Sequence, residues 1–561
     1  MEDLVASTLS QELKIPHMVA RFLVARGIKN VVDANRILRG SADDVLDPMG
    51  ILGMDKALDW ILNVRDLRAK VFIFGDYDLD GMTSVTLLTR GLKEIGVESE
   101  WRLPNRFGDG YGLSVSAVDE MYESGARYVI TVDTGITANA EIAHAKELGM
   151  SVMVMDHHQP SGDGLPISDV LIDCHQEGDS YENSELCGVG VSYKFMCALY
   201  AKLGLPVPEK YLDLVALGTL ADLVQMTPEN RYFTKSGLRR LQNSEWPGIQ
   251  ALYASLMKPG SAVGGIDVMY KMAPLLNAPG RMERPDPALK LLLCDDKSEA
   301  PALLTELKNW NSCRKQKEAE ITDMAIAQVK QVYGESVPKV LVVAGEKWHV
   351  GVIGIVSAKL AQVYGRPTAV LSIIDGIAHA SARAVPGFNW HKALFESRDL
   401  FERWGGHANA AGFSLGEDKI SELRCRLEKV AEDQGFTGEC PVCDESHAYD
   451  IQIALRELAV EGSDRTVLDF FDLMEPFGGN FPYPSFRAEN VKIHRLRELR
   501  GGHLQMEISQ AGSRVYPAIG FGLRKSKSAI GPNHVVSVVF EPTWNYYNGR
   551  KSLQLCIKAI E

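Results

Sequence analysis

Three carboxylates lie within five residues in the stretch Phe-Ile-Phe-Gly-Asp-Tyr-Asp-Leu-Asp-Gly, which covers residues 72–81. They are Asp76, Asp78 and Asp80, and at this spacing they repel one another unless they are protonated, hydrated or bound to a cation. An apolar run precedes them and apolar residues at helical spacing follow them, so we expect them between a buried strand and a helix. Open α/β sheets bind their ligands at that position. A solvated acidic turn is the alternative interpretation of these three acids alone.

Further polar groups follow apolar segments in the same way. They are Asp133 after residues 128–132, Asp156, His157 and His158 after residues 151–155, and Asp222 after residues 212–220. Strands that alternate with helices at this spacing indicate a parallel sheet, whose strands all end at one edge. Carboxylates and imidazoles together suit Mn²⁺, or Mg²⁺ where fewer His take part, and a carboxylate shared by two ions is what two-metal phosphoryl transfer needs. Taken alone, the adjacent His residues are more often surface or structural groups than ligands.

The elements that must position these groups divide the chain into five parts. We expect a helical lead-in over residues 1–50, a catalytic α/β domain over 51–296, a long connecting helix over 297–335, a smaller α/β domain over 336–435 and a β-barrel over 445–561. The connecting segment is rich in charge and has neither Pro nor Gly between Pro301 and residue 332, which favours one exposed helix between two domains. A helical hairpin within one domain is the alternative.

The composition is that of a folded protein with several domains, since the chain has 561 residues of which 45% are hydrophobic. No uninterrupted apolar stretch is long enough to cross a membrane, and the first residues lack the order of a signal peptide, so we expect a cytoplasmic protein. Nine cysteines at no regular spacing suit a reducing compartment. Cys440 and Cys443 invite a zinc interpretation, but no fourth ligand follows at finger spacing, which favours a linker with unpaired thiols.

Charge is distributed unevenly along the chain. The net charge is −13, yet residues 481–561 contain twelve Lys and Arg against five Asp and Glu. Five short β-forming runs in this part suggest a small closed barrel, for which the oligonucleotide-binding (OB) fold is the natural candidate. Aromatic and basic residues interleave there, among them Trp544, Tyr546, Tyr547 and Lys551, as in surfaces that stack bases and neutralise a nucleic-acid backbone. A barrel core for the aromatic residues and a solubility role for the charge are the alternatives.

The motifs Gly-Asp-Tyr-Asp-Leu-Asp-Gly, Val-Asp-Thr-Gly and Asp-His-His resemble those of the DHH phosphoesterase superfamily. The segments over residues 104–113, 273–281 and 475–482 resemble the RecJ-type single-strand-specific exonucleases within it. This resemblance implies a 5′→3′ exonuclease that releases mononucleotides from single-stranded DNA with Mn²⁺ or Mg²⁺, in DNA repair and recombination. It also implies a long helix between the catalytic domain and the next domain.

The resemblance also implies roles for single residues. One ion would be held by Asp76, Asp78 and Asp133, and the other by Asp80, Asp133, His157 and Asp222, so that Asp133 bridges the two ions. His158 would face the scissile phosphate, and Asp156 completes the catalytic set with Asp133 and His158. Because His157 must be neutral to bind an ion, we expect activity to fall as the pH drops through about 6 to 7.

The second α/β domain resembles the DHHA1 domain of the same family through residues 345–354, 381–383 and 404–412. Small residues around His407 would let backbone N–H groups approach a phosphate, and guanidinium groups suit phosphate oxygens in pairs. The expected phosphate and nucleic-acid contacts are Arg106, Tyr111, Arg281, Ser381, Arg383 and His407.

Two other functions compete with the exonuclease. One is a DHH phosphodiesterase that acts on short oligonucleotides or cyclic dinucleotides, although such relatives do not usually carry a basic carboxyl-terminal β domain. The other is a non-catalytic single-strand-binding replication protein, although such proteins lose ligands and this chain keeps every motif acid and both His. We expect a monomer whose partners are single-stranded DNA, a single-strand-binding protein and a helicase, with no membrane contact.

Overall fold

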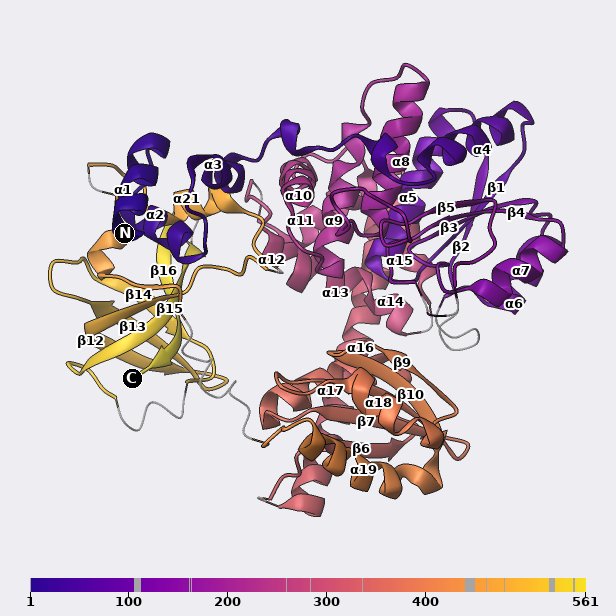
Figure 1. Cartoon of the computed structure of the whole chain (residues 1–561). Helices are drawn as coiled ribbons and strands as arrows, with labels where there is room; N and C mark the ends of the chain where they lie inside the picture. The colour runs from indigo at the N-terminus through magenta and orange to yellow at the C-terminus, as the bar shows by residue number, and fades with distance from the viewer. Residues whose placement is uncertain are drawn as a thin grey trace. The chain divides into compact units, whose positions relative to one another are not determined.

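The chain divides into two units. Figure 1 shows the chain coloured by residue number. The first unit contains residues 1–277, 285–305 and 447–561, and the second contains residues 278–284 and 306–446. The computed structural model describes the chain apart from residues 1, 105–111, 161, 163, 259, 283, 335, 439–448, 461, 479, 524–529 and 548–549, and apart from the side chains of residues 547 and 550. Arg106, Tyr111, Cys440 and Cys443 therefore lie outside the described residues.

A parallel sheet forms the centre of the first unit, with the described strands in the order β2-β1-β3-β4-β5. The strands are β1 (Val71–Gly75), β2 (Ser99–Arg102), β3 (Tyr128–Val132), β4 (Ser151–Met155) and β5 (Val170–Ile172). The three central strands are buried over almost their whole length, as their continuous apolar sequences require. The sequence-based prediction of a parallel sheet is confirmed.

Helices cover both faces of this sheet (Figure 1). The helices α6 (Val115–Glu123) and α7 (Asn139–Glu147) pack on one face in a shared apolar cluster with β1, β3 and β4. The remaining helices of this part are α4 (Met54–Asp66), α5 (Leu79–Glu94), α8 (Gly188–Lys202), α9 (Leu212–Asp222), α10 (Pro228–Leu241), α11 (Pro247–Leu256), α12 (Gly265–Asp267), α13 (Ala273–Leu276) and α15 (Asp286–Leu293). Helix α5 packs against α8, α9 and α15 and is buried along most of its length.

The order of the strands creates a switch point between β1 and β3. The chain leaves β1 for β2 on one side and returns to β3 on the other, so the loops after β1 and β3 separate at the carboxyl edge of the sheet. Ligands of open α/β sheets bind in the crevice that such divergent loops create.

The second unit is built on a mixed sheet with the described order β6-β7-β8-β10-β9. Its strands are β6 (Leu341–Glu346), β7 (Thr368–Ile374), β8 (Ile377–Arg383), β9 (Arg403–Gly406) and β10 (Ala410–Gly416), and its helices are α14 (Ala278–Arg281), α17 (Val350–Tyr364), α18 (Trp390–Glu396) and α19 (Ile420–Asp433). The single 34-residue helix α16 (Ala300–Tyr333) begins in the first unit and continues into the second. A helical hairpin over these residues is therefore wrong.

The carboxyl-terminal strands form a closed five-stranded barrel with an additional edge strand, in agreement with the predicted OB-like fold. The order of the described strands is β11-β12-β13-β14-β16-β15, and pairing of β12 with β15 closes the barrel. The elements are β11 (Ile451–Gln452), α21 (Val467–Met474), β12 (Phe486–Leu499), β13 (His503–Ser509), β14 (Tyr516–Gly520), β15 (Val535–Tyr547) and β16 (Arg550–Ile560).

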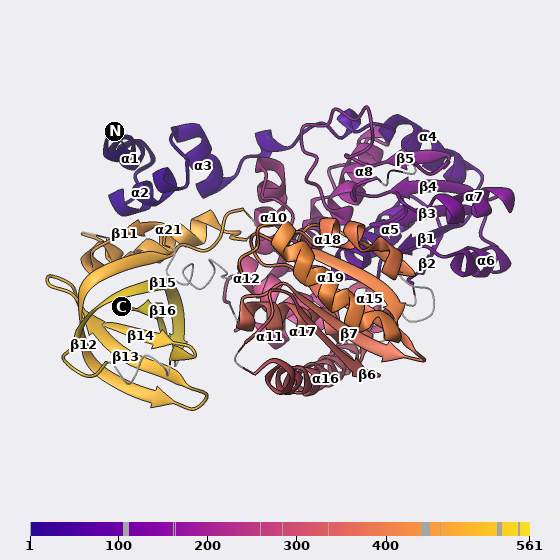
Figure 2. The same ribbon diagram turned by 60° about the horizontal axis from the view of Figure 1, so that its bottom comes forward.

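The first fifty residues are more than a lead-in to the catalytic domain. They form the helices α1 (Glu2–Leu13), α2 (His17–Ala25) and α3 (Val31–Arg39). The apolar side chains of these helices belong to the same core as those of the barrel and α21, and Figures 1 and 2 both show the helices beside α21. For example, the Phe22 ring meets the rings of Phe471 and Phe486 edge to face. The helical periodicity was visible in the sequence, but a partner more than 400 residues away was not.

Candidate metal centre

The acids of the first motif are held by the turn between β1 and α5. Asp78 is the N-cap of α5, and its Oδ1 atom accepts hydrogen bonds from the backbone N–H groups of Asp80 and Gly81 at 3.0 and 3.2 Å. A Cβ atom at Gly81 would lie 2.5 Å from the backbone oxygen of Asp76, so only glycine allows this close turn. Asp76 and Asp80 are buried as a result.

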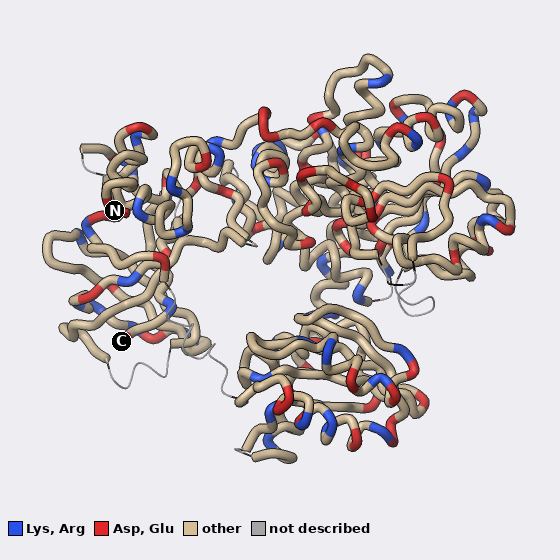
Figure 3. The backbone as a smooth tube through the Cα atoms, viewed as in Figure 1, with Lys and Arg blue, Asp and Glu red and all other residues tan. Residues whose placement is uncertain are grey.

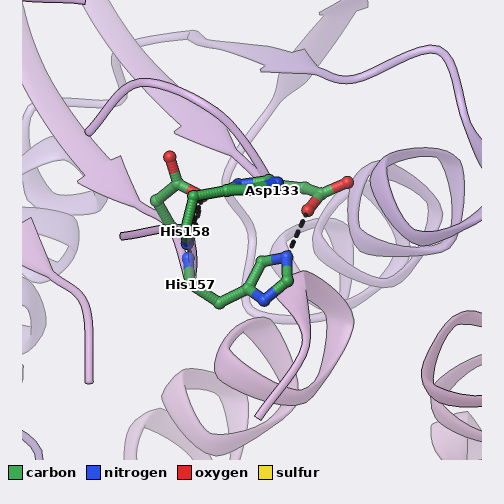
Figure 4. A group of neighbouring side chains, drawn as sticks. Asp133, His157 and His158 are labelled. Atoms are coloured by element: carbon green, nitrogen blue, oxygen red, sulfur yellow. Dashed lines mark hydrogen bonds and ion pairs between the residues drawn. The ribbon is translucent and has the colours of Figure 1, made fainter. Parts of the chain in front are cut away.

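Asp133 follows β3 in a left-handed backbone conformation with φ of 57°, which is unusual for a residue other than glycine. The residue is only 2% exposed. Oδ1 of Asp133 lies 3.0 Å from Nε2 of His157, and Figure 4 shows the His157 ring directed at this carboxylate. Strained conformations of this kind persist where the surrounding structure fixes them, often at functional sites.

The sequence-predicted ligands come together in two groups. Oxygen atoms of Asp76, Asp78 and Asp133 lie within 4.8 Å of one another, and the same holds for ligand atoms of Asp80, His157 and Asp222. Nε2 of His157 lies 3.8 Å from an oxygen of Asp80 and 3.8 Å from an oxygen of Asp222. Acidic residues gather at this edge of the sheet, which Figure 3 shows in red.

The donor set fits a pair of divalent cations. Nε2 of His157 is buried and makes no hydrogen bond within the described residues, so its lone pair is available to an ion. The surrounding atoms are carboxylate oxygens, and one imidazole among several carboxylates is a set that binds Mn²⁺ or Mg²⁺. Burial of so many carboxylates without a compensating cation would be costly.

The electrostatics of the site support the same conclusion. Burial, together with the nearby Asp222 and Asp78, raises the pKa of Asp80 to about 8. Burial also raises the pKa of Asp133 well above its usual value, with Asp80 and other acids adding to the effect. Burial and Asp78 raise the pKa of Asp222 to about 6. Such shifts measure how strongly the site favours an added positive charge.

His157 and His158 occupy different electrostatic environments although their rings lie 4.4 Å apart. Burial, with the neighbouring His158, lowers the pKa of His157 to about 3, so its ring is neutral over the ordinary pH range. Burial alone would lower the pKa of His158, but the hydrogen bond to Asp156 and the nearby carboxylates raise it to about 9. The pH dependence expected from His157 between about 6 and 7 must therefore be assigned to other groups.

Asp156 orients the two His residues. Its Oδ1 atom accepts hydrogen bonds from the backbone N–H of His157 at 2.8 Å and from Nδ1 of His158 at 2.7 Å, and its Oδ2 atom accepts one from the backbone N–H of Ile136 at 2.9 Å. Both carboxylate oxygens are thus occupied within the protein. In this geometry Asp156 fixes the ring of His158, in the way that carboxylates orient His beside metal sites.

Two glycines in the helices behind the acids complete the site, and sequence reasoning missed them. The backbone N–H groups of Gly188 and Val189, at the start of α8, donate to the two oxygens of Asp80 at 2.6 and 2.9 Å. A Cβ atom at Gly188 would lie 2.6 Å from the Cβ atom of Asp133, and one at Gly218 would lie 2.6 Å from Oδ1 of Asp80. A helix that starts with Gly188-Val-Gly190 is the only sequence signal for this close approach.

Four of the predicted phosphate-binding residues lie in the described part of the second unit, where two of them are in contact. Ser381 and Arg383 lie on β8, where a guanidinium N–H of Arg383 donates to Oγ of Ser381 at 3.2 Å. A Cβ atom at Gly354 of α17 would lie 2.9 Å from that Oγ atom, so the start of α17 passes close to this pair. Arg281 ends α14, and its carbonyl oxygen lies close to Gly351 in the first turn of α17. His407 is exposed in the turn between β9 and β10.

The aromatic residues of the barrel are only partly available for stacking. The indole N–H of Trp544 donates to a carboxylate oxygen of Asp472 at 3.0 Å, and Nζ of Lys551 lies 3.8 Å from the centre of the Trp544 ring. Nζ of Lys258 lies 5.3 Å from the ring centre of Tyr546. Trp544 therefore stabilises the packing of α21 on the barrel and does not offer a free stacking surface on that face.

Comparisons with known proteins match three regions of the chain. Residues 70–219 match the DHH family N-terminal domain, residues 337–433 match the DHHA1 domain and residues 449–559 match the RecJ OB domain. Over the described residues, no helix combines the length and the apolar character needed to span a membrane.

Relatives cover nearly the whole chain. The single-stranded-DNA-specific exonuclease RecJ of Bacillus subtilis is 36% identical over 99% of this chain and 69% of its own length. The protein of the same description from Salmonella typhimurium is 30% identical over 97% of this chain and 96% of its own length. The crystal structure of Thermus thermophilus RecJ in complex with Mn²⁺ superimposes with a TM-score of 0.81 at 26% identity, covering 99% of this chain and 77% of that one. With the two groups of ligands at the edge of the parallel sheet, these matches show that the chain belongs to the RecJ family of single-stranded-DNA-specific exonucleases.

Proposed function

We propose that the protein hydrolyses single-stranded DNA from the 5′ end, releases mononucleotides and uses two Mn²⁺ or Mg²⁺ ions, in DNA repair and recombination. The observation that carries this proposal is the pair of ligand groups, Asp76, Asp78 and Asp133 beside Asp80, His157 and Asp222, at one sheet edge of a RecJ-family chain. Asp133 is the ligand shared by both ions in this proposal, since its carboxylate adjoins both groups.

The side chains divide the work of phosphodiester hydrolysis. Two bound metal ions would supply an activated water and offset the negative charge that develops on the phosphate. Asp133 and Asp80 would hold the ions. Both carboxylates are fixed by the protein, Asp133 through its left-handed backbone conformation and Asp80 through hydrogen bonds from the N-terminus of α8. His158 would direct its other ring nitrogen at a phosphate oxygen, while the hydrogen bond to Asp156 fixes the orientation of the ring.

The strand itself is bound by groups in both units. We assign phosphate contacts to Arg281, Ser381, Arg383 and His407 of the second unit, and further contacts to Arg106 and Tyr111. The pairing of Arg383 with Ser381 near the start of α17 supports the assignment, because a guanidinium and a helix N-terminus both favour an anion. The barrel binds the strand through its basic residues.

The proposed domain division is a catalytic domain over residues 51–296, the connecting helix over 297–335, a DHHA1 domain over 336–435 and a nucleic-acid-binding barrel over 445–561. Residues 1–50 belong with the barrel, whose core they share. We propose that the protein acts as a monomer in the cytoplasm, where a helicase exposes single strands and a single-strand-binding protein delivers them.

The test uses a single-stranded oligonucleotide labelled at either end, and its duplex, with Mn²⁺, Mg²⁺ or chelator. Wild-type protein is compared with Asp133→Ala and with Asp169→Asn, which changes a carboxylate just before β5 that pairs with Lys146. Mononucleotides from the 5′ end of the single strand, lost with chelator and with Asp133→Ala only, are the expected result.

Other outcomes separate the competing functions. A strand that is bound but never cut would establish a non-catalytic binding protein. A strand that is neither cut nor bound, together with hydrolysis of cyclic dinucleotides or very short oligonucleotides, would establish a small-substrate phosphodiesterase.

A further inference from the structure

We infer that Asn230 is a positioning residue for the ligand group of Asp80, His157 and Asp222. The inference rests on the proposed function, because it concerns how the same metal centre is held in shape. Asn230 lies in the first turn of α10, outside the parallel sheet and outside both ligand groups.

The side chain of Asn230 joins two backbone segments that are distant in sequence. Its Nδ2 group donates to the carbonyl oxygen of Glu185 at 2.6 Å and to the carbonyl oxygen of Gln225 at 2.9 Å. Its Oδ1 atom accepts a hydrogen bond from Nδ2 of Asn183 at 3.2 Å. With 2% of its surface exposed, Asn230 makes these bonds out of contact with bulk water.

Both segments lead directly to the metal centre. Glu185 precedes by three residues Gly188, whose N–H group donates to Asp80 at 2.6 Å. Gln225 follows Asp222 by three residues, across Leu223 in the left-handed conformation with φ of 62°. One amide group therefore sets the separation between the segment that holds Asp80 and the loop that follows Asp222 at the end of α9.

A buried network keeps Asn230 in place. The Asn230 network consists of Tyr181, Asn183, Lys194, Glu229 and Asn230, and each of these is less than a tenth exposed. Glu229 accepts hydrogen bonds from Nζ of Lys194 at 2.7 Å and from Nδ2 of Asn183 at 2.9 Å. Since Asn183 also donates to Asn230, the amide of Asn230 has a single orientation in which Nδ2 points at the two carbonyl oxygens.

A purely structural role for Asn230 makes a different prediction from a positioning role. Ser244 provides the comparison, because it is 4% exposed and donates to Asp213 at 2.6 Å in the first turn of α9. Asp222 ends the same helix, so Ser244 and Asn230 contact opposite ends of α9 and its following loop. Loss of either hydrogen bond lowers stability, but only loss of the Asn230 bonds displaces the ligands.

The experiment is a calorimetric titration of the metal-free full chain with Mn²⁺, without DNA, for wild type, Asn230→Ala, Asn230→Asp, Ser244→Ala and Asp222→Ala. Asp222→Ala identifies the ion held by the group of Asp80, His157 and Asp222. We expect both Asn230 variants to lower the affinity for that ion by about tenfold or more, and the affinity for the other ion by less than about twofold. Asn230→Asp keeps the shape but replaces the donor with an acceptor, so it should be at least as impaired as Asn230→Ala.

Two results would overturn the inference. In one, Asn230→Ala binds both ions as wild type does; in the other, it weakens both ions equally and lowers the melting temperature by the same amount as Ser244→Ala. The proposed function is judged separately by cleavage of single-stranded DNA. If wild type cleaves DNA and Asn230→Ala binds both Mn²⁺ ions normally, only the inference is refuted. If Asn230→Ala loses affinity for one ion selectively but wild type does not cleave DNA, only the proposed function is refuted.

Discussion

At the scale of single residues, Asp133 is the side chain on which the centre depends most. It adjoins both ligand groups, lies in a left-handed conformation and is almost completely buried. We expect Asp133→Asn to lose affinity for both ions and to lower the rate of strand cleavage by more than about 100-fold, because loss of partners outside the ligand shell alone costs about 10–100-fold. Metal titration and single-turnover cleavage measure the two effects. Retention of one ion with wild-type affinity would show that Asp133 does not bridge.

The carboxylates determine the pH dependence of metal binding. Burial raises the pKa of Asp80 to about 8 and that of Asp222 to about 6, so the metal-free protein carries protons that an ion must displace. We therefore expect the affinity for Mn²⁺ to rise between about pH 6 and about pH 8, with release of protons that diminishes at higher pH. Titration in the presence of an indicator dye measures both quantities. Equal affinity without proton release across this range would contradict the assignment.

The sequence predicted the acids and His of the site because their residue types and their place after apolar strands carry the signal. Nothing comparable marks Gly188 or Asn230. Gly188 contributes its backbone N–H group and the absence of a Cβ atom. Asn230 binds backbone carbonyl groups, which every residue type offers. Contributions made by the backbone become visible only when the distances between segments are known.

At the scale of elements, the N-terminus of α8 packs directly against the carboxylates of the metal centre. Gly188→Ala would place a Cβ atom 2.6 Å from Asp133, so the helix or the carboxylate has to move. We expect at least about a tenfold loss of Mn²⁺ affinity from this single methyl group. Gly190→Ala is the matched control, since the nearest atoms to its Cβ atom would be those of the Leu186 and Cys187 side chains, at 3.3 Å or more. Similar losses in both variants, measured by metal titration, would show that helix packing rather than the centre is affected.

The strands and helices could be predicted where the sequence of a single element carries a clear pattern of its own. The strands β1, β3 and β4 and the long helix α16 agree closely with the sequence-based expectations. The role of the first fifty residues and the packing of Trp544 could not be predicted, because both depend on partners distant in sequence. Apolar periodicity shows that one face of an element is buried, but it does not show which other element packs on that face.

At the scale of the whole molecule, binding of the strand should depend on exposed basic residues of the barrel. Lys492 and Arg495 on β12 are exposed, and the Arg495 side chain is 80% accessible although it pairs with Glu507. We expect Lys492→Ala with Arg495→Ala to weaken binding of single strands and to reduce the slope of log affinity against log salt by about one to two. Fluorescence anisotropy across salt concentrations measures this slope.

Lys56 and Arg68, exposed at α4 and just after it, provide the control pair for that experiment. Removing both charges there should leave the salt slope unchanged. An equal reduction from the two pairs would mean that net charge, and not the barrel surface, governs binding.

The barrel is also connected to the metal centre through the first turn of α10. Arg231, next to Asn230, donates to the carbonyl oxygens of Met474 and Pro476 at 2.8 and 3.1 Å, and the backbone N–H of Met226 donates to Asn480 at 3.3 Å. The loop after Asp222 therefore contacts the segment that leads into β12. A protein shortened before the barrel lacks these supports as well as the proposed DNA-binding surface.

The core shared by residues 6–38 and 453–557 has a consequence for synthesis on the ribosome. The helices α1–α3 leave the exit tunnel long before the barrel, and their apolar faces find their partner only after the barrel has been translated. At about 5–20 residues per second, this interval lasts on the order of 25–100 seconds. Stalled nascent chains that end before β12 should be cleaved by protease within α1–α3, whereas released full-length chains should resist. Throughout that interval Phe22 and its neighbours are exposed to chaperones, so production of the enzyme depends on how well the cell shields its first helices.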